Sequence, residues 1–390
     1  MKNKYEHIQN TPANLDTSGS DWRTITFSHP ERIIRLGTSF SGIGAIEQAI
    51  KRLGLNCEIM FAGDIDEDCR KSYFANYSIL PERWHKDIHD LDATQFNGSI
   101  DLFVGGAPCQ AFSMRGKRGG FDDTRGTLFR EFARIVMECR PKVFIFENVR
   151  GMINHDQGRT WATIKKTFED DCNYQVYFQV LNGKNYGIPQ SRERLFCIGF
   201  LNETEFKYPA PISLGDTGVY DFLDEEFDGK YFLKQKGVTF VSRKLNYEKS
   251  YTQVNGQVML CQKHNQQFNW HGDFVFHPLL SSSAPALPED TLFDVRELET
   301  SYFVNNTLNK YAIIKEDGSK WRMCPGSGEF SGYGRFRKLT PRECLRLMGF
   351  DDSFKIVVPD AAVYKQSGNS IIVNVLMAIL KQMDITKYGV

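Results

Sequence analysis

Residues 33–44 read IIRLGTSFSGIG and predict a strand, a glycine turn and the start of a helix. The apolar run at 33–38 is typical of a buried strand in a parallel sheet. Gly42 and Gly44 permit the positive φ values that a tight strand-to-helix turn uses. The helix expected over residues 43–53 has four apolar residues on one face: Ile43, Ile46, Ile50 and Leu53. This stretch therefore predicts the first β–α unit of an α/β fold.

The alternation of strand and helix patterns continues to about residue 200. Further strands are expected at residues 58–62, 101–104, 142–146, 175–181 and 194–200. Further helices are expected at residues 67–77 and 127–138. A β–α–β–α order of elements puts helices on both faces of a sheet whose strands are mostly parallel. We therefore expect a doubly wound, mostly parallel sheet.

Shifts in composition divide the chain into four parts. Residues 1–31 form a polar extension, and residues 32–208 carry the alternating pattern. Residues 209–334 have short aromatic-rich segments broken by Gly, Asn, Ser and Pro, which predicts a second, smaller and irregular β-rich domain. Residues 335–390 regain helix signals, with a capping box at Thr340 to Glu343 and an apolar face over 371–383. That face needs a large apolar partner, so we expect the C-terminal segment to pack on the first domain.

Composition excludes several classes of protein. Hydrophobic residues make up 41% and charged residues 25%, as is usual for a globular chain. Because the chain has no run of about 18 apolar residues and no apolar N-terminal segment, we expect neither a membrane span nor a secretory signal. The nine cysteines form no C-x-x-C pair, which indicates a reduced cytoplasmic protein without a disulfide framework or a metal site.

Charge is balanced over the whole chain but uneven along it. The 48 basic residues equal the 48 acidic ones, so the net charge gives no support for nucleic-acid binding. Residues 229–277 and 319–346 nevertheless have a clear basic excess. These two stretches could hold a polyanion, or they could be solvated surface without a partner.

The glycine turn at residues 40–44 suggests a cofactor site. Glycines at the carboxyl end of a first strand let a ligand approach the backbone. The turn lacks the G-x-G-x-x-G pattern, so a cofactor without a pyrophosphate fits better. Asp64 follows Gly42 by about 20 residues, at the end of the second expected strand, where an acid can accept hydrogen bonds from ribose hydroxyls. A purely structural turn is the alternative.

A reactive cysteine is expected directly after the third strand. Pro108, Cys109 and Gln110 lie where an open α/β sheet presents catalytic groups. The following residues, 111–125, are rich in Gly, Lys and Arg, so they resemble a loop that closes over an anionic ligand. Basic neighbours favour the thiolate form of Cys109. An inert buried thiol is the alternative.

Two further charged positions follow apolar strands. Glu147 comes after a run of Val, Phe and Ile, where burying a carboxyl is costly unless it has a task. Arg192 and Arg194 open a later strand two residues apart, and therefore on one face. The alternatives are structural roles: Glu147 could cap a helix, and the two arginines could form salt bridges at the protein surface.

Seven strings of the chain, taken together, resemble the DNA (cytosine-5)-methyltransferases, in the order and with the spacing of that family. They are FSGIG at 40–44, GAPCQAFS at 106–113, RGTL at 125–128, FENV at 146–149, YGIPQSRER at 186–194, RKLTPRECLRLMG at 337–349 and KQSGNS at 365–370. Only the N-terminal tail and about residues 209–333 lie outside the resemblance. Two positions depart from the family pattern: Thr38 stands where Asp is common, and Ala45 stands where Gly is common.

The resemblance implies a Rossmann-like methyltransferase fold and a role for many residues. Cys109 would be the nucleophile, Glu147 would hold the cytosine ring, and Arg192 and Arg194 would support the base and its backbone. S-adenosylmethionine would be the cofactor, and no metal would be needed. The residues in contact with S-adenosylmethionine would be Phe40, Gly42, Ile43, Gly44, Asp64, Ile65, Asp87, Ile88, Pro108, Leu128, Asn369 and Ser370. DNA contacts would come from Gln110, Ser113, Arg115, Lys117, Arg118, Arg125, Arg335 and Arg337.

The resemblance also implies a substrate and a setting. A cytosine would swing out of double-stranded DNA to reach Cys109, and residues 209–334 would form the target-recognition domain. We expect a cytoplasmic bacterial monomer that is the modification half of a restriction–modification system, with a cognate restriction endonuclease as partner. A tRNA methyltransferase and an inactive DNA-binding relative are the alternatives. A Cys-Phe-Thr string would favour the first and loss of the Pro-Cys or Glu-Asn-Val strings the second, but the chain shows neither.

Overall fold

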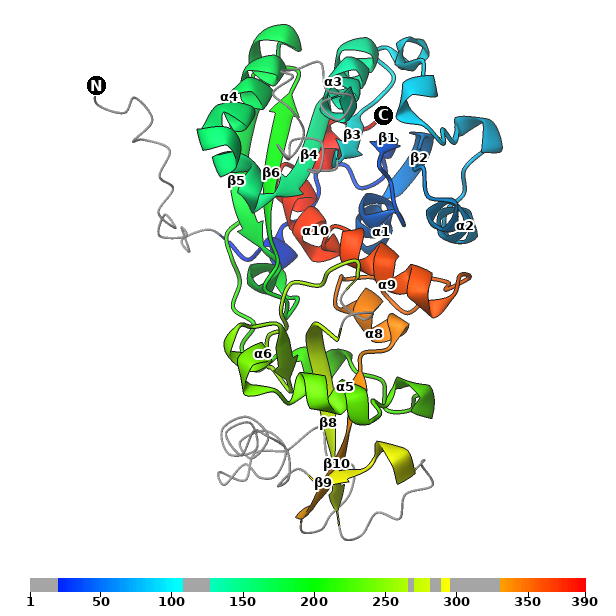
Figure 1. Ribbon diagram of the computed structural model, residues 1–390. Helices are drawn as coiled ribbons and strands as arrows, with labels where there is room; N and C mark the ends of the chain where they lie inside the picture. Colours follow the sequence, from blue (N-terminus) through cyan, green and yellow to red (C-terminus); the bar gives the residue numbers. More distant parts are fainter. Residues whose placement is uncertain (1–19, 108–126, 266–269, 281–288, 295–329) are drawn as a thin grey trace, which may run out of the picture.

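In the computed structural model, the described residues are 20–107, 127–265, 270–280, 289–294 and 330–390. Most of them belong to a lobe built on a six-stranded sheet with the strand order β2-β1-β3-β4-β6-β5 (Figure 1). The strands are β1 (Ile33–Ser39), β2 (Asn56–Phe61), β3 (Leu102–Gly105), β4 (Val143–Val149), β5 (Gln175–Asn182) and β6 (Glu193–Phe200). Strands β1 to β4 pair in parallel, and β6 is antiparallel to both β4 and β5. The expected mixed α/β fold with a mostly parallel sheet is confirmed.

Helices cover both faces of this sheet. The helices of the lobe are α1 (Ala45–Arg52), α2 (Glu67–Asn76), α3 (Thr127–Cys139), α4 (Arg159–Lys166) and α10 (Val373–Gln382). Alternate residues of β4 serve the two faces: Ile145 joins the core under α1 and α10, whereas Phe144 and Phe146 join the aromatic core under α3 and α4. The chain is therefore doubly wound, as expected.

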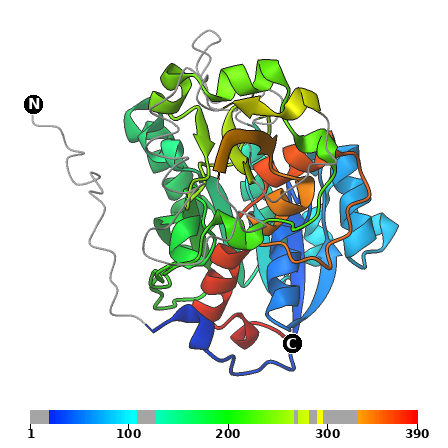
Figure 2. The same cartoon turned by 90° about the horizontal axis from the view of Figure 1, so that it is seen from below.

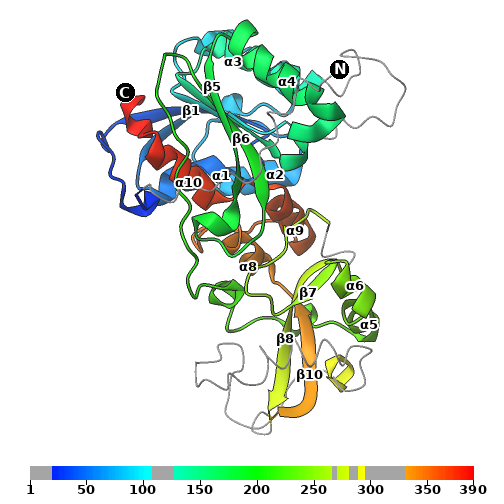
Figure 3. The same ribbon diagram turned by 90° about the vertical axis from the view of Figure 1, so that its left-hand side faces the viewer.

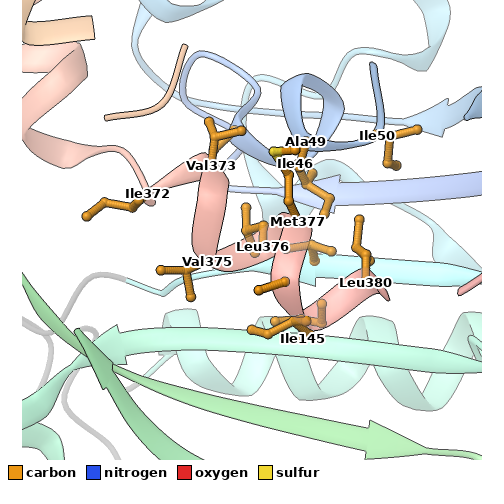
Figure 4. Packing of buried hydrophobic residues seen from close by; sticks show 14 of the residues in the cluster. Ile46, Ala49, Ile50, Ile145, Ile372, Val373, Val375, Leu376, Met377 and Leu380 are labelled. Atoms are coloured by element: carbon orange, nitrogen blue, oxygen red, sulfur yellow. The ribbon is translucent and has the colours of Figure 1, made fainter. Parts of the chain in front are cut away.

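The C-terminal segment returns to this lobe. Figure 4 shows the side chains of α10 meeting Ile46 and Ala49 of α1 on one side and Ile145 of β4 on the other. Val390 pairs with Ile33 through two backbone hydrogen bonds of 2.8 and 3.0 Å, so the chain ends beside the start of β1 (Figure 2). The expected packing of the apolar face of the last helix is confirmed.

A second, four-stranded sheet lies at the far end of the molecule, beyond α8 (Pro341–Arg346) and α9 (Asp360–Asn369) (Figure 3). Its order is β7-β8-β10-β9. These strands are β7 (Thr252–Val254), β8 (Gly272–Leu280), β9 (Phe293–Asp294) and β10 (Phe330–Lys338), accompanied by the short helices α5 (Gln235–Val241) and α6 (Lys244–Glu248). The exact limits that the sequence predicts for four domains remain a prediction.

Some elements differ from the sequence expectations. The sequence did not predict helices α4 and α9. The segment before α4 is kinked, which obscures the helical pattern. Helix α9 ends in Ser367, Gly368 and Asn369, which are typical turn residues. Strand β4 runs three residues further than expected, so that Glu147 and Asn148 lie within it. The capping box is confirmed, since Glu343 N–H donates to Thr340 and Thr340 N–H donates to Glu343. Within the described residues, no helix is long and apolar enough to cross a membrane.

Replacement of Leu376 by Ala tests the contribution of α10 to the core. Leu376 is fully buried between α1 and the sheet, so we expect its truncation to lower the free energy of unfolding by about 3 kcal/mol. Urea unfolding followed by circular dichroism measures this change. The control is Val357→Ala, which removes a half-exposed side chain and should cost under about 0.5 kcal/mol. An equal, small effect of both variants would contradict the packing described.

Candidate active site

The carboxyl ends of three parallel strands meet at one edge of the large sheet. Ser39 of β1 lies opposite Gly105 of β3, and Gly105 lies opposite Phe146 of β4. The glycine turn after β1, the chain that leaves β3 and the next residue of β4, Glu147, are therefore neighbours at this edge. Open α/β sheets bind ligands at such an edge.

Glu147 lies almost sealed at this edge. Its carboxylate Oε1 is 3.2 Å from the Nε of Arg194 on the neighbouring strand β6, and the two side chains are only 13% and 18% exposed. Burial raises the pKa of Glu147, while the nearby guanidinium groups of Arg194 and Arg192 act in the opposite direction. The Glu147 carboxyl is thus both shielded from water and paired with a cationic side chain.

The chain leaving β3 is held tightly against Glu147. A Cβ on Gly106 would lie 2.9 Å from Glu147 Oε2 and 3.0 Å from its backbone oxygen, so only glycine fits there. The amide of Asn148 donates to the backbone oxygen of Ala107 at 2.9 Å. These contacts fix the start of the segment that continues to Cys109.

The predicted nucleophile and the basic loop after it lie outside the described residues. The same holds for one predicted cofactor contact and six predicted DNA contacts: Pro108, Gln110, Ser113, Arg115, Lys117, Arg118 and Arg125.

Arg192 and Arg194 lie close enough for both to approach Cys261, but their other contacts differ. Arg194 lies in β6 beside Glu147, whereas Arg192 lies in the turn before β6 and is only 3% exposed. Arg192 donates to the backbone oxygens of Gln262, Gly368 and Ser370 at 2.7, 3.0 and 2.7 Å. Burial lowers the pKa of Arg192 to about 10, with a smaller effect from Arg194. Arg192 therefore joins three segments of the chain, and its terminal nitrogens are already engaged.

Cys261 is a neighbour of both arginines that the sequence did not single out. Its sulfur lies 3.6 Å from Arg192 Nη1 and 3.9 Å from Arg194 Nη2. It comes from the segment that leads to β8, so the site includes a residue from the region between residues 209 and 334. A lone cysteine in an irregular segment gives no sequence signal for such a position.

The glycine turn and Asp64 form the second half of the site. Phe40, Gly42 and Gly44 all have positive φ, at 52°, 55° and 78°. The carboxylate of Asp64 accepts hydrogen bonds from the backbone N–H of Gly42 and of Asp66, both at 2.9 Å. Burial raises the pKa of Asp64, and these two hydrogen bonds oppose that shift. Asp64 thereby joins the turns that follow β1 and β2.

The remaining predicted cofactor residues within the described part of the chain differ in exposure. A Cβ on Gly42 would meet no atom of the described residues within 4 Å, so they leave the space above the turn open. Ile65 is 73% exposed, and Asn369 is also exposed. Ile88, Leu128 and Ser370 are half-buried, Ile43 and Gly44 are buried, and the half-buried Asp87 pairs with His89 at 2.6 Å. Among the described residues, no three His, Cys, Asp or Glu side chains gather as a metal site.

The prediction that Arg335 and Arg337 contact DNA is not supported, because both side chains are buried. Arg337 makes two hydrogen bonds of 2.8 Å to Glu343 and donates to Nε2 of His277 at 3.0 Å. Arg335 donates to Thr291 at 3.0 Å. Burial and the two arginines lower the pKa of His277 to about 3, so His277 is a neutral acceptor. The arginines of β10 thus belong to the interior of the second sheet.

Comparisons with known proteins agree on one family. The family model described as C-5 cytosine-specific DNA methylase matches residues 34–384. The type II methyltransferase M.HpaII of Haemophilus parainfluenzae is 33% identical over 88% of this chain and 87% of its own. The type II methyltransferase M.HhaI of Haemophilus parahaemolyticus is 31% identical over 87% of this chain and 91% of its own.

Solved structures show the same fold at lower sequence identity. The Dnmt2 methyltransferase of S. pombe matches with a TM-score of 0.61 and 20% identity, over 90% of this chain and 98% of its own. The methyltransferase EhMeth of Entamoeba histolytica matches with a TM-score of 0.63 and 15% identity, over the same shares.

Replacement of Arg337 by Met tests whether the arginine has a structural task. Removal of one partner leaves the buried Glu343 carboxylate unpaired, so we expect a loss of about 3–5 kcal/mol in the free energy of unfolding. The double variant Arg337→Met/Glu343→Gln, with no buried charge at the pair, should recover most of that loss. Its DNA binding should keep the salt dependence of the parent, whereas loss of a phosphate contact would lower the slope by about one. A lowered slope would restore the DNA-contact interpretation.

Proposed function

Since the chain belongs to the C-5 cytosine-specific DNA methylase family and is a DNA (cytosine-5)-methyltransferase, we propose that it methylates one cytosine within a specific sequence of double-stranded DNA. The observation that carries the proposal is the contact of Gly106 with Glu147, three residues before Cys109. This contact brings the chain that leads to a thiol beside a buried carboxyl and an arginine. Such a set suits covalent activation of a pyrimidine ring.

Cys109 supplies the covalent step. Carbon 5 of cytosine is a poor nucleophile until the Cys109 thiolate adds to carbon 6, which moves an electron pair toward carbon 5. Carbon 5 then takes the methyl group, which the sulfonium of S-adenosylmethionine would supply as it becomes a neutral thioether. Carbon 5 next loses its proton to a base, and the electron pair of that C–H bond restores the double bond as the bond between sulfur and carbon 6 breaks. The thiolate is regenerated, so atoms and electrons balance without a metal or a redox partner.

Glu147 and Arg194 hold and polarise the ring. The addition of a thiolate places negative charge on the ring near nitrogen 3, and a neutral carboxyl donates a hydrogen bond there. The raised pKa of Glu147, caused by burial, favours that neutral form. Arg194, 3.2 Å from the carboxylate, keeps the group oriented. Arg192 has a positioning task, because its terminal nitrogens bind backbone oxygens of other segments.

The residues around the glycine turn fit S-adenosylmethionine. The open space above Gly42 admits a ligand, the half-buried Asp64 carboxylate can accept ribose hydroxyls, and the exposed Ile65 offers an apolar surface beside it. When bound, the cofactor supplies an electrophilic methyl group. We assign further contacts to Phe40, Ile43, Gly44, Asp87, Ile88, Pro108, Leu128, Asn369 and Ser370.

The DNA is held by the loop after Cys109 and by the second domain. A stacked cytosine cannot reach the site, so it must swing out of the duplex at a cost of roughly a few kcal/mol. Residues 209–334 act as the target-recognition domain, between the catalytic residues 32–208 and the returning segment 335–390. Contacts to the flipped strand are assigned to Gln110, Ser113, Arg115, Lys117, Arg118 and Arg125.

The relatives also suggest the biological setting. Several are type II methyltransferases of bacteria such as Haemophilus parainfluenzae and Shigella sonnei. The protein is accordingly assigned to a bacterial cytoplasm as a monomer and as the modification half of a restriction–modification pair. Its partner would be an endonuclease that cleaves the same DNA sequence when unmethylated.

Replacement of Cys109 by Ser tests the nucleophile. We expect methyl transfer from labelled S-adenosylmethionine to DNA to fall more than about a thousandfold, because a serine hydroxyl is far less acidic and nucleophilic than the thiol. Sequence-specific DNA binding, measured by gel shift, should survive. The matched control is Cys57→Ser, which alters an exposed cysteine in the edge strand β2 and should leave activity unchanged. Full activity of Cys109→Ser would refute the mechanism.

Trapping with 5-fluorocytosine tests the order of bond formation. Fluorine on carbon 5 cannot leave as a proton, so DNA carrying it should remain covalently attached to the enzyme after methyl transfer. A shifted band that survives denaturing electrophoresis is the expected result. The variant Glu147→Gln should trap about 100-fold more slowly, since it cannot donate a carboxyl proton to the ring. Absence of the adduct with active enzyme would rule out attack by Cys109.

A further inference from the structure

Glu47 is a buried carboxyl that the proposed mechanism does not use. It lies in the first turn of α1, directly behind the glycine turn, and is only 4% exposed. Its Oε1 accepts hydrogen bonds from the hydroxyl of Tyr73 at 2.5 Å and from that of Thr38 at 3.3 Å. Its Oε2 is buried and has no hydrogen-bond partner among the residues that the structure describes. Burying an ionised carboxyl with an unpaired oxygen costs folding free energy, so such a carboxyl is usually neutral or has a functional role.

The hydrogen bonds that end at Glu47 run in one direction. Thr38 has a single hydroxyl proton, and that proton goes to Glu47. The hydroxyl oxygens of Thr38 and Ser41 lie 2.7 Å apart, and a donation by Ser41 fits the contact of Thr38 with Glu47. The Ser41 oxygen in turn accepts from the backbone N–H of Gly63 at 3.0 Å. The series therefore runs from Gly63 through Ser41 and Thr38 to Glu47.

The same series fixes the two turns that border the cofactor site. Ser41 N–H donates to the Gly63 oxygen at 2.9 Å, so residues 41 and 63 are joined twice. The next residues, Gly42 and Asp64, are joined at 2.9 Å. Behind the turn, the hydroxyl of Tyr77 donates to the Gly44 oxygen at 2.8 Å. A shift of Ser41 would thus move Gly42 and, with it, the hydrogen bond from Gly42 to Asp64.

Burial favours the neutral form of Glu47, because that form places no unpaired charge in the interior. Burial raises the pKa of Glu47 to about 7, while the hydrogen bonds from Tyr73 and Thr38 oppose that shift. In the neutral acid, Oε1 is a carbonyl oxygen that accepts both hydroxyls, and Oε2 carries the proton. The group then acts as an acceptor and not as a charge.

We propose that Glu47 is a positioning residue for the cofactor, and that as a neutral acceptor it orients the hydroxyls of Thr38 and Ser41 and so sets the turn at residues 40–44. The carboxyl of Glu47 reaches the end of β1 from the neighbouring helix α1, through its contact with Thr38 at 3.3 Å. This inference rests on the proposed cofactor site and deepens it.

Calorimetric binding of S-adenosylhomocysteine to the full chain tests the proposal. We expect Glu47→Gln to bind within about threefold of the parent, because an amide oxygen accepts the same two hydroxyls. Glu47→Ala and Thr38→Val should each bind about tenfold more weakly, since each breaks the series. The double variant should be no weaker than either single one, because both changes remove one shared interaction. Specific DNA affinity should not change in any of them.

Two controls separate the outcomes. Glu67→Ala, which removes an exposed glutamate in the first turn of α2, should bind like the parent. Absence of binding by the parent itself would refute the proposed cofactor site and, with it, this inference. If the parent binds, equal losses in Glu47→Gln and Glu47→Ala would show a role for charge and overturn the proposal. Unchanged affinity in Thr38→Val would overturn it too, even if Glu47→Ala failed to fold.

Discussion

The site depends on the parallel pairing of β3 with β1 on one side and with β4 on the other. This pairing aligns Ser39, Gly105 and Phe146 at one edge of the sheet. The glycine turn, the chain that leads to Cys109 and the carboxyl of Glu147 all start from that edge. Close approach requires glycine, since a Cβ on Gly105 would lie 2.5 Å from the Ser39 hydroxyl oxygen. Backbone spacing, more than any side chain, thus brings the reactive groups together.

Buried charges join the two sheets of the molecule. Arg192 links the turn before β6 to the segment before β8 and to the end of α9. The Arg337–Glu343 pair links β10 to α8, with both side chains fully buried. Because burying ions costs nearly as much as their attraction returns, such contacts specify geometry more than they add stability. They orient the region that we assign to target recognition relative to the catalytic edge.

Much of this arrangement could be predicted from the sequence. Apolar runs, glycine turns and the capping box are local signals, so the α/β fold and the returning helix were foreseeable. The antiparallel direction of β6 was not, because strand direction depends on long-range pairing. The burial of Arg335 and Arg337 was missed for a similar reason, since a basic pattern does not reveal that Glu343 lies opposite. Glu47 and Cys261 were missed because single residues without a motif carry no local signal.

We infer that this edge of the sheet transfers a methyl group to carbon 5 of cytosine in duplex DNA. Bisulfite sequencing of plasmid from bacterial cells that express the protein tests it most directly, because conversion spares cytosines methylated at carbon 5. We predict protected cytosines at one position of a single short sequence motif, and no such protection in cells with the empty vector. Complete conversion of all cytosines, with the folded protein present in the cells, would contradict the account.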